Sequence, residues 1–263
     1  MIPPDWLPQW LFVILYAVPP LILLWVIHKG FQTFAPHWIL KDQDENMAAG
    51  GIASIAALTG IVLAFVLAIT FQTNDTFQND IGVEATQIRN MDKLLAASQD
   101  TQALSCRQPL ISYAQSIVDD EWPQLQKQTS SPITSRLLNE LNTCLLKIKS
   151  NNLTESVIYL EIIKLSNDIT QSRETRIGNS AASISTIFWI VMHIGLFLTI
   201  ALSAMAFYTP GQLRVINCSI QIIFVSILMA LVMILDRPYL GDYGVSNEPI
   251  KHVITHIQDP SRL

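Results

Sequence analysis

Four long stretches of the sequence contain no Asp, Glu, Lys or Arg, and they constrain the fold more than any other feature. They cover residues 10–27, 47–71, 177–208 and 215–235, with lengths of 18, 25, 32 and 21 residues. About 20 apolar residues cross the hydrocarbon core of a bilayer as a helix. Because each backbone amide inside lipid must find its hydrogen bond within the protein, helices are the expected form. We therefore predict four membrane-spanning helices.

The composition agrees with a membrane protein and disfavours several other classes. Charged residues make up only 14% of the chain, whereas an average soluble domain has about a quarter. The 16 Lys and Arg are outnumbered by 21 Asp and Glu, so the basic balance typical of nucleic-acid binding is missing. The first stretch lacks the basic start and the small-residue cleavage site of a signal peptide, and we interpret it as a retained span. Its Pro19-Pro20 pair predicts a kink.

Residues 72–176, between the second and third spans, form the one sizeable region that we expect outside the membrane. They contain ten Lys or Arg and thirteen Asp or Glu. Apolar residues recur at helical spacing, which predicts three or four helices. Breaks are expected near Asp100, at Trp122-Pro123, around residues 130–132 and at residues 150–152. The predicted fold is all-α: four transmembrane helices with a helical extramembrane domain between the second and third spans.

This interpretation divides the chain into four parts. Residues 1–71 hold transmembrane helices 1 and 2, residues 72–176 the helical domain, residues 177–235 transmembrane helices 3 and 4, and residues 236–263 a C-terminal tail. An even number of spans puts the termini and the domain on one face of the membrane. Lys and Arg near the span ends are almost evenly divided between the two faces, so they do not determine the orientation. We assign the protein to the inner cell membrane with the domain in the cytoplasm. Cys106 and Cys144 could pair in an oxidising compartment, but we expect two buried, reduced thiols.

Several short motifs, in order along the chain, resemble those of one family. They are Gly60-Ile-Val-Leu-Ala-Phe65 in the second span, Asp120-Glu121-Trp122-Pro123 in the domain, Arg173 and Arg176 before Trp189, and Asp236-Arg237-Pro238-Tyr239-Leu240-Gly241 after the fourth span. Together they resemble the bacterial membrane domain of unknown function that is labelled bestrophin-like. The resemblance implies similarity to bestrophins, which are oligomeric anion channels with four membrane helices per subunit and a pore lined by the second.

The resemblance also marks a set of structural residues. These are Glu121, Trp122, Pro123, Arg173, Arg176, Asp236, Arg237, Pro238 and Gly241. We expect Trp122 to be buried as a pivot between two helices. At the exit of the fourth span, Pro238 ends the helix and Arg237 sits at its C-terminal dipole, where a cation is favoured. Asp236 is positioned to pair with Arg237, Arg173 or Arg176, as a structural anchor or, alternatively, as a linkage to a gate.

The second span carries the candidate pore. On a helical wheel, Ala53, Ala57, Gly60, Ala64 and Ala68 form a stripe of small residues, which allows close helix packing in a membrane. The candidate pore or gate residues are Val62, Phe65, Val66, Ile69 and Thr73. A large apolar face of this kind can form a constriction that gates by dewetting. A lipid-facing surface is the alternative interpretation.

Three acids follow this span at spacings of four to five residues. They are Asp75, Asp80 and Glu84. In a symmetric oligomer they would form acidic rings at the pore mouth, and such rings favour cations. That preference differs from the anion selectivity that the resemblance implies. A solvated polar helix face is the alternative.

Two functional hypotheses follow. The first is a homo-oligomeric ion channel whose partners are the lipid bilayer, further copies of itself and inorganic ions. The second is a non-conducting membrane scaffold or sensor whose helical domain binds a partner. We expect no enzyme activity and no cofactor, because the sequence has no phosphate loop, nucleophile elbow or zinc signature. His252 and His256 have metal-ligand spacing with Asp259 as the nearest acid, but we interpret this segment as an amphipathic tail helix and predict no metal and no nucleic acid.

Overall fold

The computed structural model describes residues 8–34, 45–98, 100–149, 153–205, 212–241 and 244–259, and the described chain is helical, as predicted. It divides into two compact units. The first, which we call the membrane unit, comprises Met1–Gln72, Ser183–Asp236 and Gly241–Tyr243. The second, which we call the helical domain, comprises Thr73–Ala182, Arg237–Leu240 and Gly244–Leu263.

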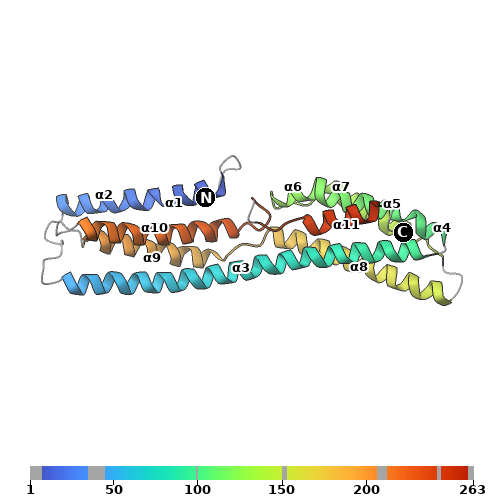
Figure 1. Cartoon of the computed structure of the whole chain (residues 1–263), viewed down its shortest axis with the longest axis horizontal. Coiled ribbons are helices and arrows are strands. Elements are labelled where there is room, and N and C mark those ends of the chain that lie inside the picture. Colours follow the sequence, from blue (N-terminus) through green and yellow to red (C-terminus); the bar gives the residue numbers. More distant parts are fainter. Residues whose placement is uncertain are drawn as a thin grey trace. The chain divides into compact units, whose positions relative to one another are not determined.

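The membrane unit contains the four predicted spans. Its helices are α1 (Gln9–Tyr16), α2 (Val18–Phe34), the first part of α3 (Glu45–Ala97), α9 (Thr186–Met205) and α10 (Gln212–Leu235). Four helical segments are long and apolar enough to cross a membrane: Gln9–Phe34, Gly50–Ala97, Thr186–Met205 and Val215–Leu235. Helices α2, α9 and α10 pack against one another, and α1 packs against α10 (Figure 1). The protein is therefore a multi-pass membrane protein by its fold.

Two features of the spans follow directly from local sequence. The first span is interrupted at Ala17, between α1 and α2, because Pro19 and Pro20 have no N–H to donate to the preceding turn. The interruption lies next to the Pro19-Pro20 pair, where the kink was predicted. The third span begins at Thr186, later than the uncharged stretch that starts at Ile177, because α8 (Leu153–Ser180) takes up the first residues of that stretch.

Helices α3 and α9 approach closely at Gly195. A Cβ atom added there would lie 2.6 Å from the Thr59 Oγ1 atom, so a side chain larger than hydrogen does not fit without a shift. Small residues allow such contacts between membrane helices. Contacts of this kind were predicted along the second span and not at Gly195.

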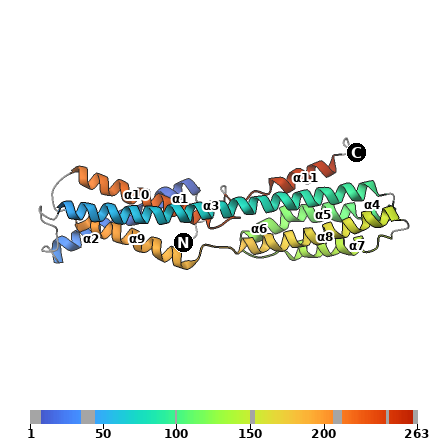
Figure 2. The same cartoon turned by 90° about the horizontal axis from the view of Figure 1, so that it is seen from below.

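The helical domain consists of further helices alongside the second part of α3 (Figure 2). They are α4 (Thr101–Ser105), α5 (Arg107–Ser116), a π-helix (η3, Ile117–Glu121), α6 (Trp122–Leu125), α7 (Pro132–Leu145), α8 and α11 (Glu248–Gln258). Asp100 caps α4 by accepting from the Gln102 N–H, and Ser131 caps α7 by accepting from the Thr134 N–H. The predicted breaks near these two residues are confirmed, whereas residues 150–152 lie outside the described residues.

The core of the helical domain joins α3, α5, α7, α8 and α11. Its most buried members are Ile81, Ile88, Met91, Leu95, Leu110, Tyr113, Ile117, Leu125, Leu141, Leu145, Ile169 and Ile250. Cys106, at the start of α5, forms a disulfide with Cys144 near the end of α7, with a Cα–Cα distance of 5.7 Å. The expectation of two reduced thiols is therefore wrong for this structure, because the packing of α5 on α7 brings the two cysteines together.

Candidate functional site

The π-helix η3 places a carboxylate inside the helical domain. The Trp122 N–H donates to the Ile117 carbonyl, five residues earlier. Pro123 has no N–H, and its ring disfavours an ordinary α-turn with the residue four positions before it. The chain therefore widens into a π-turn before Trp122-Pro123 and continues directly as α6, so the break predicted there is wrong. π-Turns are rare and are frequently found at functional sites, and here the turn ends at the fully buried Glu121.

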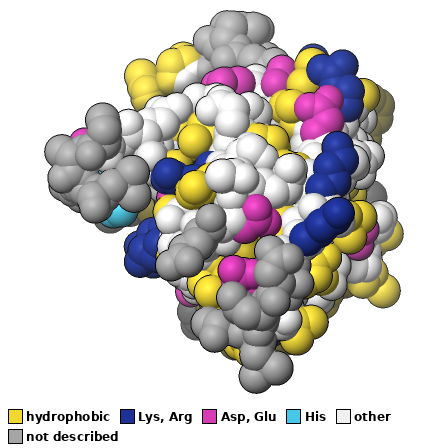
Figure 3. Space-filling model, turned by 90° about the vertical axis from the view of Figure 1, so that its right-hand side faces the viewer, with side chains coloured by type: hydrophobic (Ala, Val, Ile, Leu, Met, Phe, Trp, Pro, Cys, Tyr) yellow, Lys and Arg dark blue, Asp and Glu magenta, His cyan; other side chains and the backbone are white. Residues whose placement is uncertain are grey.

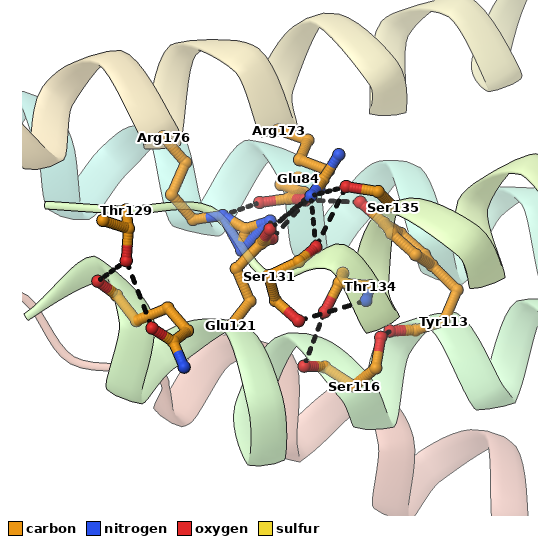
Figure 4. Close-up of polar contacts among 11 residues, drawn as sticks. Glu84, Tyr113, Ser116, Glu121, Thr129, Ser131, Thr134, Ser135, Arg173 and Arg176 are labelled. Carbon is orange, nitrogen blue, oxygen red and sulfur yellow. Dashed lines mark hydrogen bonds and ion pairs between the residues drawn. The ribbon is translucent and has the colours of Figure 1, made fainter. Parts of the chain in front are cut away.

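Two arginines on α8 bind this carboxylate (Figure 4). Arg173 and Arg176 are three residues apart, so they share one face of the helix. The Arg173 Nε donates to both carboxylate oxygens of Glu121 at 3.0 and 3.1 Å. The Arg176 Nη2 donates to Glu121 Oε2 at 2.7 Å. Bidentate contacts of this kind between guanidinium and carboxylate groups are strong and directional.

Arg176 also contacts a second buried carboxylate, that of Glu84 on α3. Its Nε lies 3.2 Å from Glu84 Oε2, and the Tyr113 hydroxyl donates to Glu84 Oε1 at 3.2 Å. Burial raises the pKa of Glu84 above its usual range, while the charge of Arg176 acts in the opposite direction. Burial also raises the pKa of Tyr113, so its hydroxyl stays protonated and serves as the donor.

The start of α7 completes the network. The Arg173 Nη2 donates to the Ser135 hydroxyl at 2.9 Å and to the Ser131 carbonyl at 3.4 Å. The contacts of Glu84, Tyr113, Glu121, Arg173 and Arg176 therefore connect α3, α5, η3, α7 and α8. We call these five residues the buried ion network.

An aromatic pair lies next to the network. Trp122 is only 8% exposed, which confirms its predicted burial, and its ring meets that of Tyr239 edge-on with a centroid distance of 5.3 Å. Tyr239 belongs to the segment after the fourth span, where the Val245 N–H donates to the Pro238 carbonyl. Tyr239 belongs to one of the sequence motifs, but its contact with Trp122 was not predicted.

The formal charges of the network cancel, because two carboxylates face two guanidinium groups. Removing one partner of a buried ion pair leaves an uncompensated charge and lowers the free energy of unfolding strongly. Replacing the whole pair by apolar residues of similar volume changes it much less. Within the described residues, no group of three or more His, Cys, Asp and Glu side chains is placed to hold a metal ion. The arrangement is therefore suited to fix the relative positions of helices.

The predicted pore residues lie on different faces of α3. Phe65 and Ile69 are 59% and 43% exposed, Val62 and Thr73 are half-buried, and Val66 is 3% exposed and packs in the core of the membrane unit. Val66 thus faces other helices of the same chain.

The three predicted mouth acids are also divided. Asp75 is exposed, and Asp80 accepts from the Asn179 side-chain amide at 3.1 Å. Glu84 belongs to the buried ion network instead of an exposed face. A signal for its burial was present, because Glu84 shares a helical face with the core residues Ile81 and Ile88, three before and four after it.

The motif after the fourth span has a structural role in each unit. The Asp236 carboxylate accepts from the Ile184 N–H just before α9. Arg173 and Arg176, which were predicted as possible partners of Asp236, bind Glu121, and Arg176 also contacts Glu84. Gly241 has a φ of +77°, which favours glycine, and an added Cβ would overlap the Gln9 side-chain amide. Arg237 and Pro238 follow the end of α10 at Leu235.

The four spans, the helical domain and its buried ion network define an all-helical multi-pass membrane protein with a domain inserted between the second and third spans. Residues 14–250 match the family model of the Bestrophin-like domain. The chain belongs to this family.

Solved structures show the same fold. A variant of a bacterial bestrophin homologue from Klebsiella pneumoniae matches with a TM-score of 0.68 at 12% identity, over 95% of this chain and 99% of that chain. A second variant of that homologue gives a TM-score of 0.67 at 12% identity, over 93% and 95% of the two chains. Another crystal structure, described as a membrane protein, gives 0.67 at 12% identity, over 95% and 98%. Among curated proteins, no match is found.

Proposed function

We propose that the protein is a homo-oligomeric ion channel in which the membrane part of α3 lines the pore. The observation that carries this proposal is the outward face of α3, which a single chain leaves uncovered. On this face lie the small residues Ala57, Ala64 and Ala68 beside the larger Phe65 and Ile69. Membership of the Bestrophin-like family supports the assignment.

The small residues provide the contact between copies in this proposal. A Cβ atom added at Gly60 would meet no atom within 4 Å, so within one chain there is open space at the position where the stripe predicts close helix packing. A neighbouring helix from a second copy fits this space, because small residues let membrane helices approach closely.

Oligomerisation is tested by measuring the mass of the detergent-solubilised particle. Gly60→Leu should shift the particle toward smaller assemblies, since the added side chain holds a neighbouring helix away. Gly30→Leu is the matched control, because an added Cβ at Gly30 in α2 also meets no atom within 4 Å. Unchanged assembly in Gly60→Leu would remove the small-residue contact from the proposal.

In the assembled channel, Phe65 and Ile69 form the apolar constriction, with Val62 beside them and Val66 supporting them from the core. Thr73 follows, and Asp75 and Asp80 supply carboxylates at the mouth. An apolar constriction gates by dewetting, and a ring of acids favours cations. The acidic mouth therefore favours cations, whereas the resemblance to bestrophins implies a channel selective for anions.

Ion flux into liposomes tests conduction. Ile69→Ser should wet the constriction and raise the flux, whereas Ile220→Ser, at a more exposed isoleucine of α10, should leave it unchanged. Asp80→Asn should lower the preference for cations, with an effect that shrinks as salt screens the charge. Absence of protein-dependent flux in the wild type and in Ile69→Ser would favour the scaffold hypothesis.

The proposal keeps the helical domain in the cytoplasm of the cell. Thiols are kept reduced in that compartment, so the disulfide between Cys106 and Cys144 counts against this placement and supplies its test, which is alkylation of the two cysteines in freshly quenched intact cells. A disulfide already present in freshly quenched cells would place the domain on the oxidising side of the membrane.

A further inference from the structure

A groove between α3 and α11 is not used by the proposed channel. Its volume is about 500 Å³, within the range of small-molecule sites. Both walls belong to the helical domain: Gly82, Ala85 and Arg89 come from α3, and His252 and His256 come from α11.

The groove is open because the α3 wall has almost no side chains at its centre. Gly82 has none, and a Cβ added there would meet no atom within 4 Å. Ala85 and, on the opposite wall, Val253 are nearly fully buried and form an apolar floor. Helix α11 reaches this position because its apolar residues Ile250, Val253 and Ile257 pack into the domain core.

The rim combines one cationic hydrogen-bond donor, Arg89, with imidazole groups that can donate or accept. Arg89 is exposed and has no ion-pair partner among the residues that the structure describes. His252 and His256 are one turn apart on α11, and both line the groove. The Thr86 hydroxyl already donates its proton to the Gly82 carbonyl. A ligand with an acceptor group that reaches the Arg89 guanidinium therefore fits this rim.

Asp259, at the end of α11, limits how much negative charge the groove accepts. It lines the same groove and has an interaction of its own. Its carboxylate opposes part of the attraction that Arg89 exerts on an anion, which disfavours a dianion more than a monoanion. A metal ion is also disfavoured, because the described residues contain no metal-binding group of three or more His, Cys, Asp and Glu side chains.

We propose that this groove binds a small organic monocarboxylate with a short hydrocarbon chain. The carboxylate lies against Arg89, whose planar guanidinium matches it with two parallel hydrogen bonds, and the imidazoles of His252 and His256 donate further bonds. The hydrocarbon chain covers the floor formed by Ala85 and Val253. This site is independent of ion conduction and goes beyond the proposed channel function.

Binding is tested on the full-length protein in a neutral detergent with butyrate as the probe. Hydrogen exchange of peptides from α11 and from residues 82–89 is followed during a butyrate titration, and butyramide at the same concentrations controls for the uncharged chain. Butyrate should slow exchange at both segments, and butyramide should not. Equal effects of the two compounds, or protection by inorganic phosphate but not by butyrate, would overturn the assignment to a monocarboxylate.

Two variants locate the site. Gly82→Leu should abolish the effect of butyrate by filling the groove, and leucine is a better helix former than glycine, so the helix is preserved. Gly178→Leu is the matched control in α8, since a Cβ at Gly178 also meets no atom within 4 Å, and it should respond as the wild type does. Arg89→Gln should weaken the apparent affinity by about tenfold, the loss of one charge-assisted contact.

If butyrate protects Gly82→Leu as well as the wild type, the ligand does not lie in this groove and the proposal is wrong. The readout does not depend on conduction, so failure of the channel proposal leaves this test intact.

Discussion

The carboxylate of Glu121 gives the sharpest test of the buried ion network. It accepts hydrogen bonds from both Arg173 and Arg176, and its side chain is fully buried. Glu121→Gln keeps the shape of the side chain but leaves two buried guanidinium groups with one carboxylate, that of Glu84. Removing one partner of a buried ion pair costs about 3–5 kcal/mol. We therefore expect the free energy of unfolding of the helical domain to fall by about 3 kcal/mol or more.

An exposed ion pair in the same domain provides the control. The Arg136 Nε lies 3.7 Å from Glu140 Oε1, and the two side chains are 70% and 58% exposed. Exposed pairs of this spacing on a helix contribute only about 0.3–0.5 kcal/mol. Glu140→Gln removes the same kind of charge, so its effect should be roughly ten times smaller than that of Glu121→Gln.

Hydrogen exchange of the full-length protein in detergent measures both effects where they occur. Amide protection in α5, α7 and α8 reports the free energy of opening of the domain, and a loss of about 3 kcal/mol corresponds to more than a hundredfold faster exchange. If Glu121→Gln and Glu140→Gln cause the same small change in exchange rate, the free energy lost by burying the charges cancels the free energy gained by pairing them. The network would then not hold the domain together.

Three further predictions concern other contacts. Reducing the disulfide between Cys106 and Cys144, whose sequence separation is 38, should lower the free energy of unfolding by about 4 kcal/mol on the loop-entropy model, and an unchanged melting temperature with reductant would contradict this. Gly195→Ala should cost about 1–3 kcal/mol through overpacking against Thr59, measured as a lower melting temperature that Thr59→Ala partly restores. Burial raises the pKa of Glu84 above 4.5, so the folded state binds its proton more tightly than the unfolded state does. The free energy of unfolding of the wild type relative to that of Glu84→Gln should therefore be greatest below pH 4.5 and should fall as the pH rises toward the raised pKa. A stability difference that stays constant with pH would contradict this assignment.

The spans were predictable because lipid imposes a simple rule on the chain. A stretch of about 20 residues without charge is long enough to cross the bilayer, and each of the four spans overlaps one of the four stretches found in the sequence. Their ends were less predictable. Ile177 to Ser180 carry no charge but continue α8 in the helical domain, since a lack of charge does not distinguish a buried helix end from a membrane segment.

The members of the buried ion network were mostly identified from sequence, whereas their pairing was not. Glu121, Arg173 and Arg176 stood out through motifs, but Glu121 is separated from the two arginines by 52 and 55 residues. No local pattern connects groups so far apart. The π-turn that directs Glu121 into the core was also not predictable, because Pro123 indicates only that an ordinary α-helix is disfavoured at this position.

The position of Glu84 follows from the charge requirement of the network. A guanidinium group does not lose its proton inside a protein, so burying both Arg173 and Arg176 calls for two negative charges. Glu121 supplies one, and the second must come from another element that faces the same core. On α3 that face is marked by Ile81 and Ile88, and Glu84 is the acid that lies between them on it. The carboxylates available for a pore mouth in the proposed channel are therefore those of Asp75 and Asp80, so any cation preference must come from two acids per subunit and not from three.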